Sequence, residues 1–496
     1  MHIKSLKDKV LQLAIQGKLV PQNENDEPAS ILLEKIKEEK EQLIKNKVIK
    51  KEKLLPEISE EEKLFDLPRG WEWCRLGSIG QIIGGGTPSS TNPEYYSENE
   101  IPWLTPADLR CYKEKYISNG NRFITKLGLE KSSARMLPIG SVLFSSRAPI
   151  GYVVINENEI CTNQGFKSIV PYKIGMNEYI YYFLKYNTKN IEEMAAGTTF
   201  KEISGKGMSE VIIPVPPLEE QKRIVAKIES LFKLIDELDN NKQEVLQNIS
   251  DTRNKVLHLA IQGKLVPQNE NDEPASVLLE KIKEEKEQLI KNKVIKKEKP
   301  LPEISEEEKL FELPRGWEWC RLCDITHSQK LNDGDWIVSS DMDDKGSVKL
   351  IQLGSIGDGK YLEKGFKNIT NETFDRLKCK EICEGDILIN RLLGKKMLAC
   401  MLPKIEGRKI TSVDTCFIKP NKDIYNSKFI LYLVLSEYFQ EKAYSKVAGT
   451  TRQRISKGNL ITIVFPLPPL EEQRRIVVKI DSIMNYLDII EKEIGN

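Results

Sequence analysis

The sequence predicts an α+β fold: two globular α/β domains separated by two long helices that form an antiparallel coiled coil, in a pseudo-two-fold, cyclic arrangement. Three observations predict it. The block Lys9–Leu76 returns as Lys255–Leu322 with only four substitutions. Each copy is followed by a stretch rich in short strands and loops, and the two stretches differ from each other. After each stretch a Pro-Pro-Leu-Glu-Glu-Gln segment opens a helix with apolar residues at heptad spacing.

The composition allows two ordinary hydrophobic cores. The chain has 496 residues, of which 40% are hydrophobic, and 75 basic residues nearly balance 74 acidic ones. A net charge of +1 neither requires nor excludes a nucleic-acid partner, because one face can be basic while others are acidic. No apolar run approaches the roughly 18 residues of a membrane span, and the first residues lack the apolar core of a signal peptide. We therefore expect a cytoplasmic protein without membrane contact.

The nine cysteines do not predict a disulfide framework in a reducing compartment. Cys320-x2-Cys323 and Cys379-x3-Cys383 could together form a four-thiolate zinc site. The internal repeat argues against this, because Gly77 stands in the first copy where the second has Cys323. We expect ordinary reduced thiols and no bound metal.

Each copy of the repeat predicts two helices. Apolar residues from Ile3 to Leu13 step by three and four, and Gly17 can end that helix. Pro28 suits the first turn of a second helix that extends through Ile44. The charged run Lys35–Lys53 could be a nucleic-acid patch, but its mixed signs at helical spacing favour a solvated helix face.

The sequence between the conserved segments of each half predicts short strands and loops. From Gly77 to about Met194 apolar stretches alternate with turn residues, and Tyr179–Tyr186 predicts a short closing helix. Beyond Pro217 a long helix begins with an apolar side from Ile224 to Leu238, and after the polar interval Asp239–Gln243 the apolar side resumes at Leu246. If this is one helix to about Gln262, it is roughly 65 Å long. From Cys323 to about Lys446 the second middle is again rich in strands and loops.

The last helix stops where the central helix continues, and the N-terminal helix supplies the missing part. The apolar positions of the last helix extend from Ile476 to Ile494. The two long helices should pair in antiparallel fashion, with the two middles at opposite ends. Such fixed spacing suits a ligand with two separated, unlike subsites, and DNA has a regular pitch of roughly 34 Å. The predicted regions are an N-terminal helical region 1–66, a first variable domain 67–215, a central helical spacer 216–312, a second variable domain 313–467 and a C-terminal helix 468–496.

Several motifs together resemble one known family. Leu67-Pro68-x-Gly70-Trp71 precedes the first variable domain, and Leu313-Pro314-x-Gly316-Trp317 precedes the second. The first domain also contains Gly85-Gly86-Thr87-Pro88-Ser89, Ile101–Leu109 (Ile-Pro-Trp-Leu-Thr-Pro-Ala-Asp-Leu), Gly140–Gly151 and Thr162-Asn163-Gln164-Gly165-Phe166. With the Pro-Leu-Glu-Glu-Gln helix openings, these motifs make the chain similar over essentially its whole length to the specificity (S) subunits of Type I DNA restriction–modification systems.

The resemblance implies a function and partners. Each variable region would be a target-recognition domain that reads one half of a bipartite site in double-stranded DNA. The helices would set the spacer and dock two methyltransferase (modification) subunits, and motor–nuclease (restriction) subunits would join for cleavage. This chain would bind no cofactor, whereas the partners would use S-adenosylmethionine, and ATP with magnesium for restriction.

In the second domain the motifs are weaker. We match Gly385–Arg391 to Gly140–Arg147 and Val413–Phe417 to Thr162–Phe166, and find no clear counterpart of the Gly-Thr-Pro-Ser loop.

Candidate DNA contacts are polar or basic residues on loops that follow strands or precede the helices. Base edges are read by Arg, Lys, Asn, Gln, Ser and Thr, and phosphates by basic or hydroxyl groups. Alternatively, the Gly and Thr residues only shape turns and the arginines pair with nearby acids. Arg452 and Arg454 are favoured because neither has an acid adjacent in sequence. The predicted contacts are Thr87, Ser89, Thr105, Ser146, Arg147, Asn163, Gln164, Thr198, Thr199, Lys201, Asn390, Arg391, Lys395, Lys396, Thr450, Thr451, Arg452, Gln453, Arg454 and Lys457.

No catalytic motif is complete. Asn92-Pro93-Glu94-Tyr95 breaks the Asn-Pro-Pro-Tyr pattern of adenine methyltransferases, and Ser204-Gly205-Lys206-Gly207 lacks the first glycine and the hydroxyl of a phosphate-binding loop. We expect a non-catalytic subunit of an enzyme complex. The alternative is a coiled-coil scaffold whose two end domains bind proteins.

Overall fold

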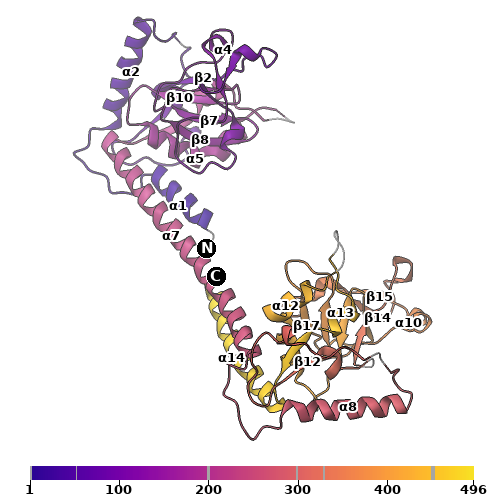
Figure 1. The fold of residues 1–496 in the computed structure, drawn as a ribbon. Coiled ribbons are helices and arrows are strands. Elements are labelled where there is room, and N and C mark those ends of the chain that lie inside the picture. Colours follow the sequence, from indigo (N-terminus) through magenta and orange to yellow (C-terminus); the bar gives the residue numbers. More distant parts are fainter. Residues whose placement is uncertain are drawn as a thin grey trace. The chain divides into compact units, whose positions relative to one another are not determined.

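A computed structural model describes residues 3–51, 53–197, 201–297, 300–327, 330–447 and 453–495. The chain forms two compact units, Met1–Asn241 and Lys242–Asn496 (Figure 1). The 44-residue helix α7 (Leu218–Ile261) contributes its first part to one unit and its last part to the other. The prediction of one continuous central helix is therefore confirmed.

The first unit begins with the repeated arm. Helices α1 (Ile3–Ile15) and α2 (Ala29–Lys45) are followed by strand β1 (Glu72–Arg75), which pairs antiparallel with β11 (Ile212–Val215). Gly17, two residues after the end of α1, has a positive φ of +66°. A Cβ at this position would lie 2.4 Å from Cγ of Pro68. A glycine is required at this position both by the backbone conformation and by the close approach of Pro68.

Two sheets form the variable part of this unit. One has the order β2 (Gly80–Gly84), β10 (Lys167–Pro171), β7 (Val142–Ser146), β8 (Ile150–Asn156), β5 (Tyr116–Ile117). The other has the order β3 (Tyr96–Ser97), β6 (Phe123–Ile124), β4 (Ile101–Leu104), β9 (Cys161–Thr162). Helix α5 (Asn177–Met194) packs on β7 and β8, and is longer than the predicted Tyr179–Tyr186. Short helices α3 (Leu76–Ile79), α4 (Lys126–Glu130) and α6 (Gly205–Glu210) complete the unit.

The second unit also has a strand pair and two sheets, but among the described residues each sheet has one edge strand fewer than its counterpart in the first unit. Helix α8 (Ala275–Lys291) is followed by β12 (Glu318–Arg321), which pairs with β20 (Val464–Leu467). One sheet has the order β13 (Leu331–Asp333), β19 (Thr415–Ile418), β16 (Ile387–Asn390), β17 (Ala399–Met401), and the other β15 (Lys367–Ile369), β14 (Val348–Ile351), β18 (Lys409–Thr411). The helices are α9 (Leu322–Ile325), α10 (Asn371–Leu377), α11 (Ser427–Leu435), α12 (Glu437–Tyr444), α13 (Lys457–Ile461) and α14 (Leu470–Gly495).

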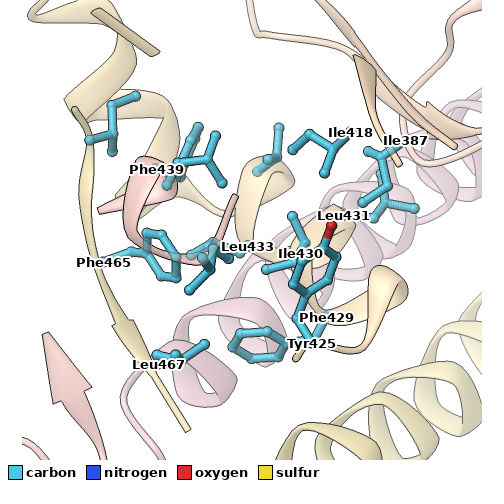
Figure 2. Close-up of a cluster of buried hydrophobic side chains, with 14 of the residues drawn as sticks. Ile387, Ile418, Tyr425, Phe429, Ile430, Leu431, Leu433, Phe439, Phe465 and Leu467 are labelled. Carbon is cyan, nitrogen blue, oxygen red and sulfur yellow. The ribbon is translucent and has the colours of Figure 1, made fainter. Parts of the chain in front are cut away.

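The second unit has a dense core between its main sheet and helices α11 and α12. Figure 2 shows Phe429, Ile430 and Leu433 of α11 beside Phe439 of α12 and Phe465 of β20. These five side chains are at most 1% exposed. Burial of this apolar area stabilises the second unit, and the same cluster includes Leu257 and Ala260 of α7 and Ile480 of α14, so the variable domain and the helices share one core.

Long helices pair in antiparallel fashion within each unit. In the first unit Lys7 of α1 forms an ion pair with Asp236 of α7 at 2.6 Å. In the second unit Arg253 of α7 forms ion pairs with Asp488 at 2.7 Å and Glu491 at 2.6 Å, both on α14. Lys7 and Arg253 each lie two residues before a copy of the repeat, so they are offset by the same 246 residues as the two arms. The N-terminal helix thus has the same role beside α7 that the last part of α7 has beside α14.

Among the described residues no helix is long and apolar enough to cross a membrane. In the same ranges no cluster of three or more His, Cys, Asp or Glu side chains has the geometry of a metal site. Cys320 and Cys379 are buried free thiols.

Candidate nucleic-acid interface

A hollow of about 420 Å³ lies in the first unit where four loops meet. The loops follow β2, β4, β7 and β9, so strand ends from both sheets converge there. Five of the predicted contacts line it: Thr87, Thr105, Arg147, Asn163 and Gln164. These residues are up to 77 positions apart in sequence, and tertiary structure brings them to one place.

Two glycines allow the loop after β2 to lie against the loop after β9. A Cβ on Gly85 would come within 2.0 Å of the Asn163 carbonyl oxygen, and the backbone N–H of Gly86 donates to Thr162 O at 2.8 Å. The next residue, Thr87, donates its hydroxyl to the Gln164 side-chain oxygen. The two loops therefore form one surface, with Thr87 and Gln164 exposed on it.

Other predicted residues shape the hollow from within. The hydroxyl of Thr105 donates to Asp108 Oδ2 at 2.6 Å, and Thr105 is only 6% exposed. The Asn163 side-chain oxygen accepts the N–H of Gly165 at 2.9 Å, and Ser146 is fully buried. In the free chain the Thr105 and Asn163 side chains stabilise loop conformations, which for Thr105 is the turn-shaping alternative. The Ser146 hydroxyl lies in β7 and accepts a hydrogen bond from Lys167 Nζ at 3.4 Å.

Glu202 pairs with two basic side chains at the edge of the hollow. It forms ion pairs with Arg147 at 3.3 Å and Lys167 at 3.0 Å. Burial alone would raise the pKa of Glu202, but the hydrogen bond from Lys167 and the two nearby cations hold it below its ordinary value. Glu202 is therefore ionised at neutral pH and partly neutralises two cations that could otherwise face phosphate.

Sequence reasoning missed one cation of this hollow, Arg122. Its side chain is exposed, and its guanidinium carbon lies 5.8 Å from the centre of the Trp103 ring. Trp103 is buried and donates its indole N–H to Gly86 O at 2.9 Å. The motif containing Trp103 was recognised, but Arg122 belongs to no motif, so no signal in the sequence marked it.

The second unit presents the equivalent loops with different side chains. The N–H of Gly334 donates to Thr415 O, as that of Gly85 donates to Phe166 O. The N–H of Asp335 donates to Thr411 O, as that of Gly86 donates to Thr162 O. A Cβ on Gly334 would lie 2.2 Å from Ser412 O, the counterpart of the Gly85 approach. Gly334 therefore corresponds to Gly85, and the prediction that the Gly-Thr-Pro-Ser loop has no clear counterpart in the second domain is wrong.

These hydrogen bonds also correct the predicted alignment. Thr162–Phe166 corresponds to Thr411–Thr415, two residues before the predicted Val413–Phe417. Similarly, the N–H of Arg391 donates to Asp414 O at 2.8 Å as that of Ser146 donates to Gly165 O at 2.7 Å. Arg391 thus occupies the place of Ser146, one residue before the place of Arg147. Strand register depends on backbone pairing, which weak motifs do not report.

Two arginines of the second unit that were predicted to contact DNA both donate a hydrogen bond to the loop at Val413. Arg391 is 5% exposed, forms an ion pair with Asp333 at 3.1 Å and donates to Val413 O. Arg454 forms an ion pair with Asp414 at 3.1 Å and donates to Val413 O at 3.0 Å. Arg454 has no acid adjacent in sequence, but the fold supplies one.

The remaining predicted residues that the structure describes lie on loops or at strand and helix ends. Ser89 hydrogen-bonds Thr91 at 2.8 Å, and the Asn390 side chain accepts the N–H of Leu392 at 2.9 Å. Lys396 forms an ion pair with Asp358, while Lys201, Lys395 and Gln453 are exposed and Lys457 is half-buried in the first turn of α13. Thr198, Thr199, Thr450, Thr451 and Arg452 lie outside the described residues. DNA contact by any of these residues remains a prediction.

Known proteins share this sequence and fold. The family described as the type I restriction modification DNA specificity domain matches residues 68–248 and 314–496. The chain is 30% identical to the type I restriction enzyme EcoAI specificity subunit of Escherichia coli over 97% of this chain and 89% of the relative. It is also 30% identical to the MjaIX specificity subunit of Methanocaldococcus jannaschii over 88% of this chain and 90% of the relative.

Solved structures agree at the level of fold. The HsdS subunit from Thermoanaerobacter tengcongensis aligns with a TM-score of 0.51 and 19% identity over 87% of this chain and 93% of that chain. A chain from a structure of the type I R-M system aligns with a TM-score of 0.55 and 20% identity over 87% of this chain and 94% of that chain. The family model matches both halves of the chain, and the relatives are similar over most of its length. The chain therefore belongs to the family of type I restriction–modification DNA specificity subunits.

Proposed function

We propose that this chain is the sequence-specific DNA-binding subunit of a type I restriction–modification complex, and that each variable domain reads one half of a bipartite site. One observation carries the proposal. The two units present the same loops on the same strand ends, with unlike side chains at equivalent places. Thr87 corresponds to Trp336 and Arg147 to Leu392. Two readers of unlike half-sites require this combination of a common scaffold and different contact groups.

The assembly is part of the same proposal. The helices would fix the spacer between half-sites and dock two methyltransferase subunits, and motor–nuclease subunits would join for cleavage. The partners would supply S-adenosylmethionine chemistry and use ATP with magnesium, and this chain would act without catalysis in the cytoplasm. The near-identity of the two arms supports two equivalent docking sites, because identical surfaces bind identical partners.

Among the predicted residues, we propose that Thr87, Gln164, Arg147 and Arg454 face DNA. Thr87 and Gln164 are exposed on the rim of the hollow, and their hydrogen bond leaves the Gln164 amide N–H groups available to a base. Arg147 and Arg454 are each about one-third exposed and lie beside an acid that DNA phosphate could replace as partner.

The proposal is tested by methylation mapping. The chain is expressed with its methyltransferase subunit in a host without related methylation, and modified bases are located genome-wide. We expect one split motif with a constant spacer. A complex that binds a protein target but shows no split motif would favour the scaffold alternative.

A second measurement assigns the contact type. Binding of the purified complex to duplexes with matched and altered half-sites is followed over a range of salt concentrations. If Arg454→Ala weakens binding similarly on every sequence, Arg454 contacts phosphate. If the loss is confined to the matched second half-site, Arg454 reads a base.

A further inference from the structure

We propose that Trp336 is a specificity-determining residue of the second unit, and that its indole makes an apolar contact with a base edge in the second half-site. The inference rests on the proposed function and names a contact that the sequence motifs did not indicate. Thymine is the base with an apolar group, its methyl, at the edge of the major groove. A thymine-containing base pair is therefore the expected target.

The backbone places Trp336 at the position of Thr87. Gly334 and Asp335 repeat the two hydrogen bonds of Gly85 and Gly86, with Asp335 N donating to Thr411 O at the same 2.8 Å as Gly86 N to Thr162 O. The next residue is Thr87 in the first unit and Trp336 in the second. Thr87 lines the hollow of the first unit, so Trp336 occupies the corresponding surface of the second.

Trp336 differs from the other tryptophans of the chain in its exposure. It is 70% exposed, whereas the remaining five of the six are buried or half-buried. Trp71, Trp103 and Trp317 are each at most 4% exposed, and each donates its indole N–H to a protein acceptor. A large apolar ring left in water has a favourable free energy available on binding, and tryptophan is enriched among residues that dominate binding energy.

The loop holds the indole outward. Asp335 is fixed on one side, because its N–H donates to Thr411 O and its carboxylate accepts the N–H of Lys380 at 2.8 Å. On the other side Ile337 packs against the cluster of Val348, Leu350 and Ile410. Since neighbours on both sides are anchored, the backbone at Trp336 and the direction in which its side chain leaves the loop are set before any ligand arrives. The loop backbone therefore loses little conformational entropy on contact, which favours a role in recognition.

The loop next to the Gly334 turn is held by two arginines, each of which is paired with an acid. Arg391 and Arg454 both donate to Val413 O on the loop adjoining the Gly334 turn. Arg454 is about one-third exposed and could exchange Asp414 for a phosphate. The two adjoining loops therefore carry an exposed aromatic ring and a cation, the two kinds of group found in nucleic-acid interfaces.

The test uses the full chain co-expressed with its methyltransferase subunit, with methylation mapping as the readout. Trp336→Ala should relax the motif at one position of the half read by the second unit and leave the first half unchanged. Binding to a matched duplex should weaken about tenfold, the effect of one good base contact. Trp336→Phe should retain part of the preference, because an aromatic ring remains.

Two further variants make the result decisive. Trp336→Thr places at this position the residue that stands at the equivalent place in the first unit, so it should fold and should lose the original preference. Val338→Ala truncates an exposed apolar side chain two residues away and should leave the motif unchanged.

An unchanged motif in Trp336→Ala and Trp336→Thr would overturn the inference. Loss of assembly with the methyltransferase subunit, measured by size-exclusion chromatography of the co-expressed complex, would also overturn it, because Trp336 would then contact a protein subunit. If the unmodified chain yields no split motif at all, the proposed function fails, and that outcome is distinct from failure at Trp336.

Discussion

Trp71 donates its indole N–H to Glu220 Oε2 at 3.1 Å, and this buried hydrogen bond joins the Leu-Pro-x-Gly-Trp motif to the first turn of α7. The same bond recurs between Trp317 and Glu472 at 3.0 Å, at the first turn of α14. Both glutamates are 1% exposed, and burial raises the pKa of each above its ordinary value. Each also accepts a second hydrogen bond, from Gln22 or Gln268.

A duplicated ion pair completes this anchor. Arg223 binds Asp26 at 2.6 Å and Arg475 binds Asp272 at 2.7 Å, one turn into each helix. Each variable domain is thus bounded by the same tryptophan, glutamate, arginine and aspartate. The repeat therefore conserves the attachment of each variable domain to its arm as well as the arm itself.

The first prediction concerns this anchor. Trp71→Phe and Trp317→Phe each remove the indole donor and leave a buried carboxylate with one partner fewer. We expect each unit to lose roughly 1.5–3 kcal/mol of stability, the range for a hydrogen bond to a charged group. Urea denaturation followed by circular dichroism measures the loss. The two variants are matched controls, and a loss in only one of them would contradict equivalent anchoring.

The second prediction concerns the turn after the first helix of each repeat. Gly17→Ala and Gly263→Ala place a Cβ at φ of about +66 to +68°, 2.4 Å from a proline ring. We expect each to destabilise its unit by roughly 1–3 kcal/mol from the backbone alone, with steric overlap in addition. Gly205→Ala is the control, because nothing lies within 4 Å of a Cβ there and its φ is not positive. Equal melting temperatures for Gly17→Ala and Gly205→Ala would contradict the prediction.

The third prediction concerns the acids beside the proposed DNA face. Glu202→Gln should free Arg147 and Lys167, and Asp414→Asn should free Arg454. Binding to non-specific duplex should tighten several-fold, and the dependence of log K on log salt should steepen by up to about one for each cation released to phosphate. Titrations at several salt concentrations measure both. Unchanged slopes in both variants would show that these cations do not face phosphate.

The fourth prediction is a pH dependence at Asp386. This aspartate is 1% exposed, and burial raises its pKa from 3.8 to about 6 despite a hydrogen bond from the N–H of Cys383 at 2.9 Å. The folded state binds the proton more tightly than the unfolded state. Its contribution to stability is therefore full below pH 4 and is lost as the pH rises to about 6.

Asp386→Asn keeps an oxygen for the Cys383 N–H but cannot ionise. The variant should be more stable than the parent at pH 7, by at most about 3 kcal/mol. The advantage should shrink as the pH falls from 6 to 4. Thermal melts of both proteins across that range provide the measurement, and a difference independent of pH would contradict it.

Much of the architecture was predictable because it depends on local and repeated patterns. Heptad spacing predicted α1, α7 and α14, and the duplicated block predicted two equivalent arms. In the first variable domain the motifs also identified five residues that line one hollow. Helical periodicity and the glycine requirement of tight turns are properties of short segments, so they can be read without a fold.

Contacts between distant segments were decided by tertiary structure. The sequence by itself determined the arms, the family resemblance and the loops that carry candidate contacts. It did not determine the strand register of the second unit, the pairing of Arg454 with Asp414, the position of Arg122 or the equivalence of Trp336 with Thr87. These depend on backbone hydrogen bonds between strands far apart in the chain, and one or two residues of register change which side chain faces the ligand.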